Sequence, residues 1–485
     1  MPHERPNIIL ITSDQQRGDC LGVQGHPVLQ TANLDHLAQM GTRFARGYAE
    51  CPSCIPARRS LMSGTAPAAN GMVGFQNGVE WNPAHTLAGD LAKAGYQTQM
   101  IGKLHLWPPR KRFGFDHMLL ADATRDGQAD GSGPSDNDYA DWLRHQHGRV
   151  EVDPAMVHGA SPNGWVGMAS HLPPEQTHTF WCIDQAMRFL QRRDPSAPFF
   201  LNISFIDPHP PLTPPAFYYD RYIHRDLPPP VVGDWAEPFD GPQKGLSPDA
   251  FKICLDENDM RCARAAYYGM INFIDDQIGR LLRFARGPWN ESFVVYTSDH
   301  GEMLGDHNLF RKGYPYEASA RVPFLMRAPG SWQMPQQVVC DSPVGLQDIM
   351  PTLLDAAGAD IPDTCTGRSL LPVMRGASDR VRDVLHGEHS GPPGGIGGHQ
   401  YLTDGHTKYV WFTQSGREQL FNLDESPNET HDLAAGADAS RLQPWRNKMI
   451  EQLAGRPEGF TDGERLIAGR PHTALVPAKA AAREY

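Results

Sequence analysis

The chain holds two cysteines separated by two residues, in the run Cys51-Pro52-Ser53-Cys54. This spacing is typical of a thiol redox pair or of one half of a zinc site. A structural zinc site needs four ligands, and the sequence offers no second CxxC to complete one. The alternative is that Cys54 acts by itself, as the first residue of the segment that ends at Arg58. In both interpretations Cys54 is a candidate for chemistry.

Carboxylate, amide and imidazole side chains follow two apolar runs that lie far apart in the sequence. Asp14 and Gln15 come after the first run, and Asp299 and His300 come after the second. Oxygen donors suit Ca²⁺, Mg²⁺ or Mn²⁺, and one imidazole is compatible with Mn²⁺ or with a tolerant Ca²⁺ site. A single Asp after a strand is more often a turn or a helix cap. The pairing of two such sets predicts a site for one divalent cation.

The apolar runs before these residues indicate strands that are buried on both faces of a parallel sheet. Three such runs end in polar residues, at positions 7–12, 199–205 and 292–297. Between them lie apolar patterns of helical period, at positions 31–41, 86–94 and 265–284. Strands that alternate with helices predict a doubly wound α/β sheet, whose ligands bind outside the carboxyl ends of the strands.

The length of the chain predicts two domains, because single hydrophobic cores stop growing at roughly 250–300 residues. Two short strands across a turn are indicated near the C-terminus, at positions 408–412 and 418–423. We therefore place the catalytic α/β domain at residues 1–375 and a smaller α+β domain at residues 376–485. Stretches rich in Gly, Asp, Ser and Pro at 122–175, and in Pro at 227–245, are predicted to be surface insertions. The tail from 474 to 485 is predicted to be loose.

The composition limits the class of protein. The chain has 44 Lys and Arg against 56 Asp and Glu, which gives a formal net charge of −12. This charge disfavours a nucleic-acid partner, and it means that local positive charge must attract an anionic substrate. The apolar stretch 7–12 is too short for a signal peptide or a membrane span, so we expect a cytoplasmic location and no membrane partner. Eight cysteines without a tight framework are expected to be reduced, apart from any modification of Cys54.

The segment Cys54-Ile55-Pro56-Ala57-Arg58, with the residues that follow it, resembles the sulfatase signature. The resemblance implies an alkaline-phosphatase-like fold, with a mostly parallel sheet flanked by helices. It also implies that a maturation enzyme oxidises Cys54 to formylglycine, whose aldehyde hydrates to a diol. One hydroxyl of a metal-bound diol attacks sulfur or phosphorus, and the second hydroxyl allows the resulting ester to collapse.

The resemblance also implies a set of metal ligands. Asp14, Gln15, Asp299 and His300 stand where the family has its ligands, and the oxidised Cys54 side chain is a further ligand. Many sulfatases have Asp in place of Gln15 and Asn in place of His300. The Gln and His resemble choline-sulfatase-like enzymes and phosphonate monoester hydrolases. Gln in place of Asp removes one negative charge, so the cation would be held less tightly and a substrate anion repelled less.

Five further residues match catalytic positions of the family. Arg58 is implied to brace residue 54 and to offset charge near the metal. In the Gly-Lys-x-His element, alternation along an extended segment is expected to point Lys103 and His105 to the same side. Lys103 would hold the diol and the substrate oxygens, and His105 would help the intermediate to collapse. His209 and Lys312 would bind the sulfate, and either could protonate the leaving oxygen.

The resemblance implies a sulfuric ester hydrolase that cleaves a sulfate monoester through a sulfated enzyme intermediate. Ca²⁺ is the expected ion, with Mn²⁺ or Mg²⁺ as alternatives. The partners would be a small sulfated substrate and a formylglycine-generating enzyme, and a homo-oligomer is left open. The alternative is a phosphonate monoester or phosphodiester hydrolase with the same formylglycine, because these substrates also carry one negative charge. A non-catalytic binding or redox protein that keeps Cys51 and Cys54 as thiols is the rival from another class.

Overall fold

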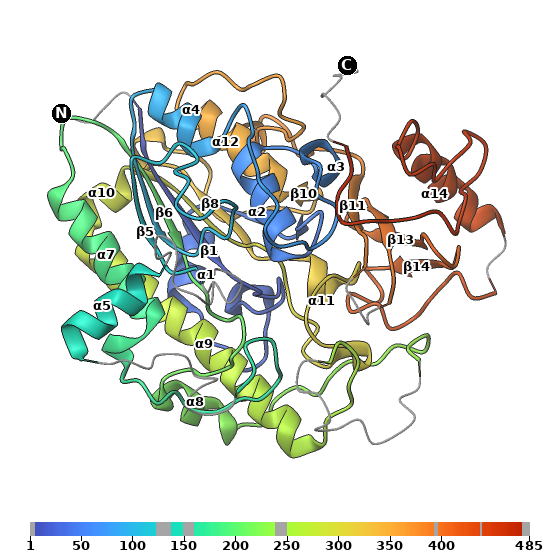
Figure 1. Ribbon diagram of the computed structural model, residues 1–485, viewed down its shortest axis with the longest axis horizontal. Helices are drawn as coiled ribbons and strands as arrows, with labels where there is room; N and C mark the ends of the chain where they lie inside the picture. Colours follow the sequence, from blue (N-terminus) through green and yellow to red (C-terminus); the bar gives the residue numbers. More distant parts are fainter. Residues whose placement is uncertain are drawn as a thin grey trace.

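An eight-stranded, mostly parallel sheet runs through the centre of the molecule, in the order β5-β4-β6-β1-β7-β8-β2-β9 (Figure 1). The computed structural model describes residues 5–122, 137–148, 160–237, 250–391, 396–436 and 439–477. Of the eight strands, β8 runs antiparallel to both of its neighbours, and the other pairs are parallel. The strands are β1 (Asn7–Ser13), β2 (Thr42–Phe44), β4 (Gln97–Gly102), β5 (His117–Leu120), β6 (Phe199–Ser204), β7 (Ser292–Ser298), β8 (Phe324–Arg327) and β9 (Val338–Cys340).

Alternation along β1 shows how the sheet is buried on both faces. Ile8 and Leu10 belong to one hydrophobic cluster, whereas Ile9 and Ile11 belong to a second cluster on the opposite face. Successive side chains of a strand point to opposite faces, so a continuous apolar run is needed where helices cover both sides. The predicted strands at 7–12, 199–205 and 292–297 are therefore confirmed, and with them the doubly wound α/β fold.

Helices cover both faces of the sheet. Figure 1 shows α2, α4 and α12 on one side, and α5, α7 and α9 on the other. Their apolar residues fill the first and the second cluster respectively. The helices are α1 (Ala32–Gln39), α2 (Cys54–Ser63), α3 (Pro67–Asn70), α4 (Leu87–Lys93), α5 (Asp138–His147), α7 (His178–Arg192), α8 (Ala216–Ile223), α9 (Glu257–Phe284), α10 (Arg286–Asn290), α11 (Glu317–Ala320), α12 (Ile349–Ala356), α13 (Leu371–Met374) and α14 (Ala439–Gln452).

A separate antiparallel sheet lies toward the C-terminus, at the right of Figure 1. It joins β11 (Leu385–His389), β12 (His399–Thr403), β13 (Thr407–Phe412) and β14 (Glu418–Asn422) in sequence order. Leu402, Trp411 and Leu420 pack with residues of α14, while the other face packs against Tyr48 and other residues near the main sheet. The two strands predicted across a turn are β13 and β14. The division of the chain at residue 375 stays a prediction.

Smaller elements complete the described chain. Strands β3 (Gly47–Tyr48) and β10 (Val344–Gly345) form a two-stranded parallel sheet. Single 3₁₀ turns lie at Gly22–Gln24, Pro174–Gln176, Asp306–Asn308, Gly330–Trp332 and Leu346–Asp348. In the part of the chain that the structure describes, no helix has the length and apolar character needed to cross a bilayer.

The prediction of a loose tail is wrong at its beginning. The Val73 backbone N–H donates to the Ala474 carbonyl at 2.8 Å, and the Val476 N–H donates to the Gly71 carbonyl at 3.1 Å. The tail therefore pairs with the segment after α3, because the backbone groups of both segments need partners where they meet. Residues 478–485 lie outside the described residues, and so do 123–136 and 149–159 of the first predicted insertion and 238–245 of the second.

Candidate active site

The residues singled out from the sequence follow four adjacent strands. Strands β4, β6, β1 and β7 are neighbours in the sheet and run parallel, so their carboxyl ends meet at one edge. Lys103 follows β4, His209 follows β6, Asp14 follows β1, and Asp299 follows β7. This edge is where a doubly wound sheet binds its ligands.

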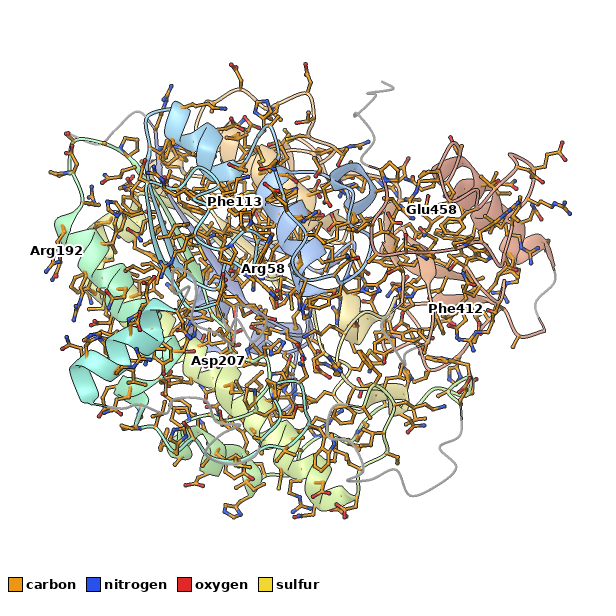
Figure 2. All side chains as sticks on the ribbon, in the orientation of Figure 1. Arg58, Phe113, Arg192, Asp207, Phe412 and Glu458 are labelled. Atoms are coloured by element: carbon orange, nitrogen blue, oxygen red, sulfur yellow. The ribbon has the colours of Figure 1, made fainter. Side chains whose placement is uncertain are left out.

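Helix α2 brings a fifth group to the same edge, because it begins at Cys54. Pro56 lies in its first turn, where a backbone N–H would have no partner within the helix, so the proline costs no hydrogen bond. Arg58 lies one turn beyond Cys54 and therefore on the same face. All ten residues of α2 are buried, and Figure 2 places Arg58 in the middle of the molecule.

Four side chains meet in a single buried cluster. The potential ligand atoms of Asp14, Cys54, Asp299 and His300 all lie within 4.8 Å of one another. Cys54 Sγ is 3.1 Å from His300 Nε2 and 3.8 Å from Asp14 Oδ1. His300 Nδ1 lies 2.9 Å from the Gly301 carbonyl, and donation to that oxygen leaves the Nε2 lone pair toward the cluster. Two carboxylates and one imidazole form a donor set that fits a hard divalent cation.

Arg58 binds the carboxylates of this cluster from behind. Its Nε donates to Asp299 Oδ2 at 2.9 Å, and its second terminal nitrogen donates to Asp14 Oδ2 at 3.4 Å. The first terminal nitrogen donates to the Lys103 carbonyl at 2.7 Å and to Ser204 Oγ at 3.0 Å. These four contacts fix the plane of the guanidinium and compensate two carboxylates that water does not reach.

The positive groups around the cluster shift two pKa values. Burial raises the pKa of the Cys54 thiol, but the ammonium groups of Lys103 and Lys312 outweigh burial and hold the pKa well below its ordinary value. Burial also raises the pKa of Asp14, yet Lys103 and Arg58 keep that pKa below its usual range. Lys103 Nζ donates to Asp14 and lies 4.0 Å from Cys54 Sγ. The site thus favours a negative charge at both positions 14 and 54.

The predicted extended geometry of the Gly-Lys-x-His element is wrong. Strand β4 ends at Gly102, and His105 has a φ of +53°, so simple alternation does not apply to this segment. Gly102 itself has a φ of +99°, and a Cβ there would lie 1.9 Å from the Ser204 carbonyl. The His105 backbone N–H donates to Asp122 at 3.0 Å, which stabilises the turn. The His105 side chain still lies near enough to Cys54 to help lower the pKa of that thiol.

His209, Lys312 and Gln15 form a chain of hydrogen bonds beside the cluster. His209 Nδ1 lies 2.7 Å from the Pro210 carbonyl, and its Nε2 lies 2.7 Å from Lys312 Nζ. Donation by Nδ1 leaves Nε2 as the acceptor for the lysine ammonium. Burial and the Lys312 charge lower the pKa of His209 to about 4, so the imidazole is neutral at pH 7. Lys312 also donates to Gln15 Oε1 at 2.5 Å, and Gln15 Nε2 donates to Glu302.

Comparison with known proteins gives this arrangement a family. The family model described as Sulfatase matches residues 6–359, which is more than half of the chain. A curated arylsulfatase from Clostridium perfringens (strain 13 / Type A) is 41% identical over 97% of this chain and 99% of its own length. The chain belongs to the sulfatase family. A second model, N-sulphoglucosamine sulphohydrolase, C-terminal, matches residues 305–456 of this sulfatase.

Two further relatives agree with that family. The choline-sulfatase of Rhizobium meliloti (strain 1021) is 29% identical over 89% of this sulfatase and 82% of its own chain. The crystal structure of the phosphonate monoester hydrolase of Agrobacterium radiobacter superposes with a TM-score of 0.76 at 26% identity. That superposition covers 93% of this chain and 95% of the other. This sulfatase therefore has the alkaline-phosphatase-like fold that the resemblance implied.

Three residues that sequence reasoning did not assign to the site support it in this sulfatase. Asp122 accepts the backbone N–H of His105, and Ser204 Oγ accepts a bond from Arg58. Glu302 accepts bonds from the Gln15 amide and from the backbone N–H of Leu304. It thereby links Gln15 to the segment that precedes Lys312. Asp122 follows the short parallel strand β5, and this position after a strand could have indicated from the sequence that Asp122 lies near the site.

Proposed function

We propose that this sulfatase hydrolyses a sulfate monoester with residue 54 as its nucleophile, after a maturation enzyme has oxidised Cys54 to formylglycine. The sulfuryl group would reside on residue 54 before release, which makes a sulfated enzyme the intermediate. One observation carries this proposal. Cys54 Sγ lies at the N-terminal end of α2, inside the buried cluster of Asp14, Asp299 and His300. A helix N-terminus and nearby cations both favour negative charge on that residue.

The same cluster supports one divalent cation. We propose Ca²⁺, with Mn²⁺ or Mg²⁺ as alternatives, because the donors are mostly oxygen. When bound, the ion would lower the pKa of a hydroxyl on residue 54 and withdraw charge from the substrate oxygens. The amide oxygen of Gln15 accepts a bond from Lys312, and its second lone pair would bind the ion. The proposed ligands are Asp14, Gln15, residue 54, Asp299 and His300.

Three side chains around residue 54 would bind the substrate, transfer protons and hold the carboxylates. Lys103, whose Nζ lies 4.0 Å from Cys54 Sγ, would hold the oxygens of residue 54 and of the substrate. His105, which helps to lower the pKa of the Cys54 thiol, would take a proton from residue 54 when the sulfate group leaves. Arg58 would hold Asp14 and Asp299 in place and offset their negative charge.

Lys312 is the proposed proton donor for the leaving oxygen. His209 Nε2 accepts a hydrogen bond from Lys312 Nζ, so the lysine holds the proton that the two groups share. The neutral His209 would orient the ammonium toward the bridging oxygen of the ester, where negative charge develops as the bond breaks.

A phosphonate monoester or phosphodiester is the alternative substrate class. The structural similarity to a phosphonate monoester hydrolase supports this alternative. Sulfate monoesters and phosphodiesters both carry one negative charge, so the same cations would bind either. The test compares kcat/KM of the converted enzyme for an aryl sulfate, an aryl phosphonate monoester and a phosphodiester. A higher kcat/KM for the sulfate is expected, and a far higher value for either phosphorus ester would refute the proposed substrate.

We further propose that the protein works in the cytoplasm on a small sulfated molecule. All eight cysteines are free thiols in the structure, which supports a reducing compartment. The partner that this proposal requires is a formylglycine-generating enzyme of the same compartment. Coexpression with and without that enzyme tests the requirement. Hydrolysis should appear only with it, and equal hydrolysis without conversion of Cys54 would contradict the proposal.

A further inference from the structure

One exposed aromatic ring lies beside His105, and a second exposed aromatic residue follows His105 in the same segment. The Phe75 ring lies 6.3 Å from the His105 ring, and Trp107 follows His105 by two residues. Phe75 is 43% exposed and Trp107 is 36% exposed. Phe217 and Phe284 are the other phenylalanine or tryptophan side chains among the exposed large hydrophobics of the described residues. Exposed aromatic rings beside a reactive group are typical of a binding surface.

The two aromatic residues belong to loops that contact each other. The Trp81 backbone N–H donates to the Trp107 carbonyl at 3.0 Å, which joins the segment after Phe75 to the segment after His105. His105 is itself partly exposed, whereas Lys103 and Cys54 behind it are buried. A group bound against Phe75 and Trp107 would therefore lie on the solvent side of His105.

The loop that carries Phe75 is held in place by the C-terminal part of the chain. The Val73 N–H donates to Ala474, and the Ser390 N–H donates to the Val73 carbonyl at 2.7 Å. At Gly74 a Cβ would lie 1.9 Å from Ser390 Oγ, so the two segments touch with no space for a side chain. Phe75 is thus exposed on a fixed backbone, and binding against it would cost little ordering of the loop.

Local charge indicates which group fits this surface. Lys111 Nζ donates to the Trp81 carbonyl at 3.0 Å, and the Arg59 guanidinium lies 5.6 Å from the Trp81 ring. Glu80 lies in the same segment, but its carboxylate accepts a bond from Asn82 at 2.8 Å. Two cations that contact Trp81, in the segment joined to Trp107, disfavour a quaternary ammonium nearby and favour a neutral aromatic ring.

We infer that Phe75 and Trp107 form the subsite for the aromatic leaving group of an aryl sulfate. This inference rests on the proposed function and adds the substrate class. A ring on the bridging oxygen would pack against Phe75 while the sulfate lies at residue 54, on the inner side of His105. Offset or edge-to-face packing of two rings, in addition to the apolar area that it buries, would favour aryl over alkyl esters.

The test uses the full-length enzyme, produced together with a formylglycine-generating enzyme. We would measure kcat and KM for phenyl sulfate, ethyl sulfate and choline sulfate with the unsubstituted enzyme and with Phe75→Ala, Phe75→Leu and Trp107→Ala. Phe284→Ala is the matched control, because Phe284 is 39% exposed and ends α9, before the opposite end of β7. The Phe75→Ala change should raise KM for phenyl sulfate about 3- to 10-fold, with kcat and the KM of ethyl sulfate near the unsubstituted values. The KM of Phe75→Leu for phenyl sulfate should lie between the values of the unsubstituted enzyme and of Phe75→Ala.

A second measurement does not depend on turnover. Titration of the Cys54→Ala protein with phenyl sulfate should give a dissociation constant that Phe75→Ala raises by the same factor. Equal losses for phenyl and ethyl sulfate, or no loss for either, would overturn the inference while the proposed function stands. A larger loss of affinity for choline sulfate than for phenyl sulfate would assign Phe75 and Trp107 to the binding of a quaternary ammonium instead. If the unsubstituted converted enzyme hydrolyses no sulfate, the proposed function fails, and the inference fails with it.

Discussion

Arg58 Nε donates to Asp299 Oδ2 at 2.9 Å, one helical turn beyond Cys54. This contact explains why an arginine four residues after the cysteine suits the site. The helix begins at residue 54, so the face that carries the cysteine also carries the guanidinium. The same guanidinium reaches Asp14, which follows the neighbouring strand. A short helical segment thus supplies both the reactive residue and the charge that stabilises its surroundings.

Replacing Arg58 should therefore remove activity and lower stability. Arg58→Gln removes the guanidinium that buried Asp14 and Asp299 share, which should cost about 3 kcal/mol of unfolding free energy. Urea unfolding and phenyl sulfate hydrolysis would be measured together. Arg382→Gln is the matched control, because Arg382 forms a buried bidentate pair with Asp348 outside the metal cluster. The control should lose stability but keep kcat, and an Arg58→Gln enzyme with unchanged kcat would contradict the assignment.

Lys312 should matter most when the leaving group is poor. If Lys312 protonates the leaving oxygen, Lys312→Met should lower kcat/KM for an alkyl sulfate by about 100-fold or more. The loss should be much smaller for 4-nitrophenyl sulfate, whose leaving group needs little protonation. His209→Ala should follow the same trend more weakly, since His209 acts through the lysine. A uniform loss across leaving groups would show that Lys312 only binds the sulfate.

Cation removal should lower both activity and thermal stability. A ligand that binds the folded state but not the unfolded state stabilises the protein, so the Tm should fall in chelator and recover with added Ca²⁺. His300→Ala removes one donor of the cluster and should weaken this recovery. Scanning calorimetry with Ca²⁺, Mn²⁺ and Mg²⁺ would rank the ions. A Tm and a rate that do not respond to chelator or to any of the three ions would contradict the proposed metal site.

The buried pair of Glu388 and Arg456 predicts a pH dependence away from the site. Burial raises the pKa of Glu388, but Arg456 outweighs burial and lowers it from 4.5 to about 2. Because the folded pKa lies below the unfolded one, the pair stabilises the fold above pH 4.5, and this stabilisation is lost as pH falls toward 2. The difference of about 2.5 pKa units corresponds to about 3 kcal/mol.

Urea unfolding of the unsubstituted protein and of Glu388→Gln tests that dependence. The difference in unfolding free energy between them should be large at pH 6 and should shrink as the pH falls below 4. Asp462→Asn is the control, since Asp462 pairs with an exposed arginine, Arg465, and should show little effect. A difference that stays constant from pH 6 to pH 3 would rule out the pair as the source.

Much of this fold could be predicted because apolar runs and helical periods are local signals. The polar residues after β1 and β7 predict a shared edge, and the parallel pairing of the two strands confirms it. Helix α9 begins at Glu257, eight residues before the predicted start at 265, since Asp256 caps a polar first turn that carries no strong apolar period. The boundary was missed because the first three helical residues, Glu257, Asn258 and Asp259, are all polar.

The parts that could not be predicted depend on contacts between distant segments. The positive φ of His105 is stabilised by Asp122, which lies seventeen positions later in the sequence. Local pattern does not reveal the backbone pairing of 474–476 with 71–73 either, because it joins segments that lie far apart in the sequence. Residue types predict a chemistry for the site, whereas tertiary hydrogen bonds decide how each side chain approaches residue 54.

The most direct test of the account is the chemical state of residue 54 measured together with turnover. Mass spectrometry of the peptide around Cys54 would give the fraction converted to the aldehyde, in preparations made with different amounts of the maturation enzyme. We predict that kcat per mole of protein rises in proportion to that fraction, that Cys51→Ala is converted like the unsubstituted chain, and that Cys54→Ala is inactive. Full activity with an unmodified cysteine at 54, or with Cys54→Ala, would contradict the central claim.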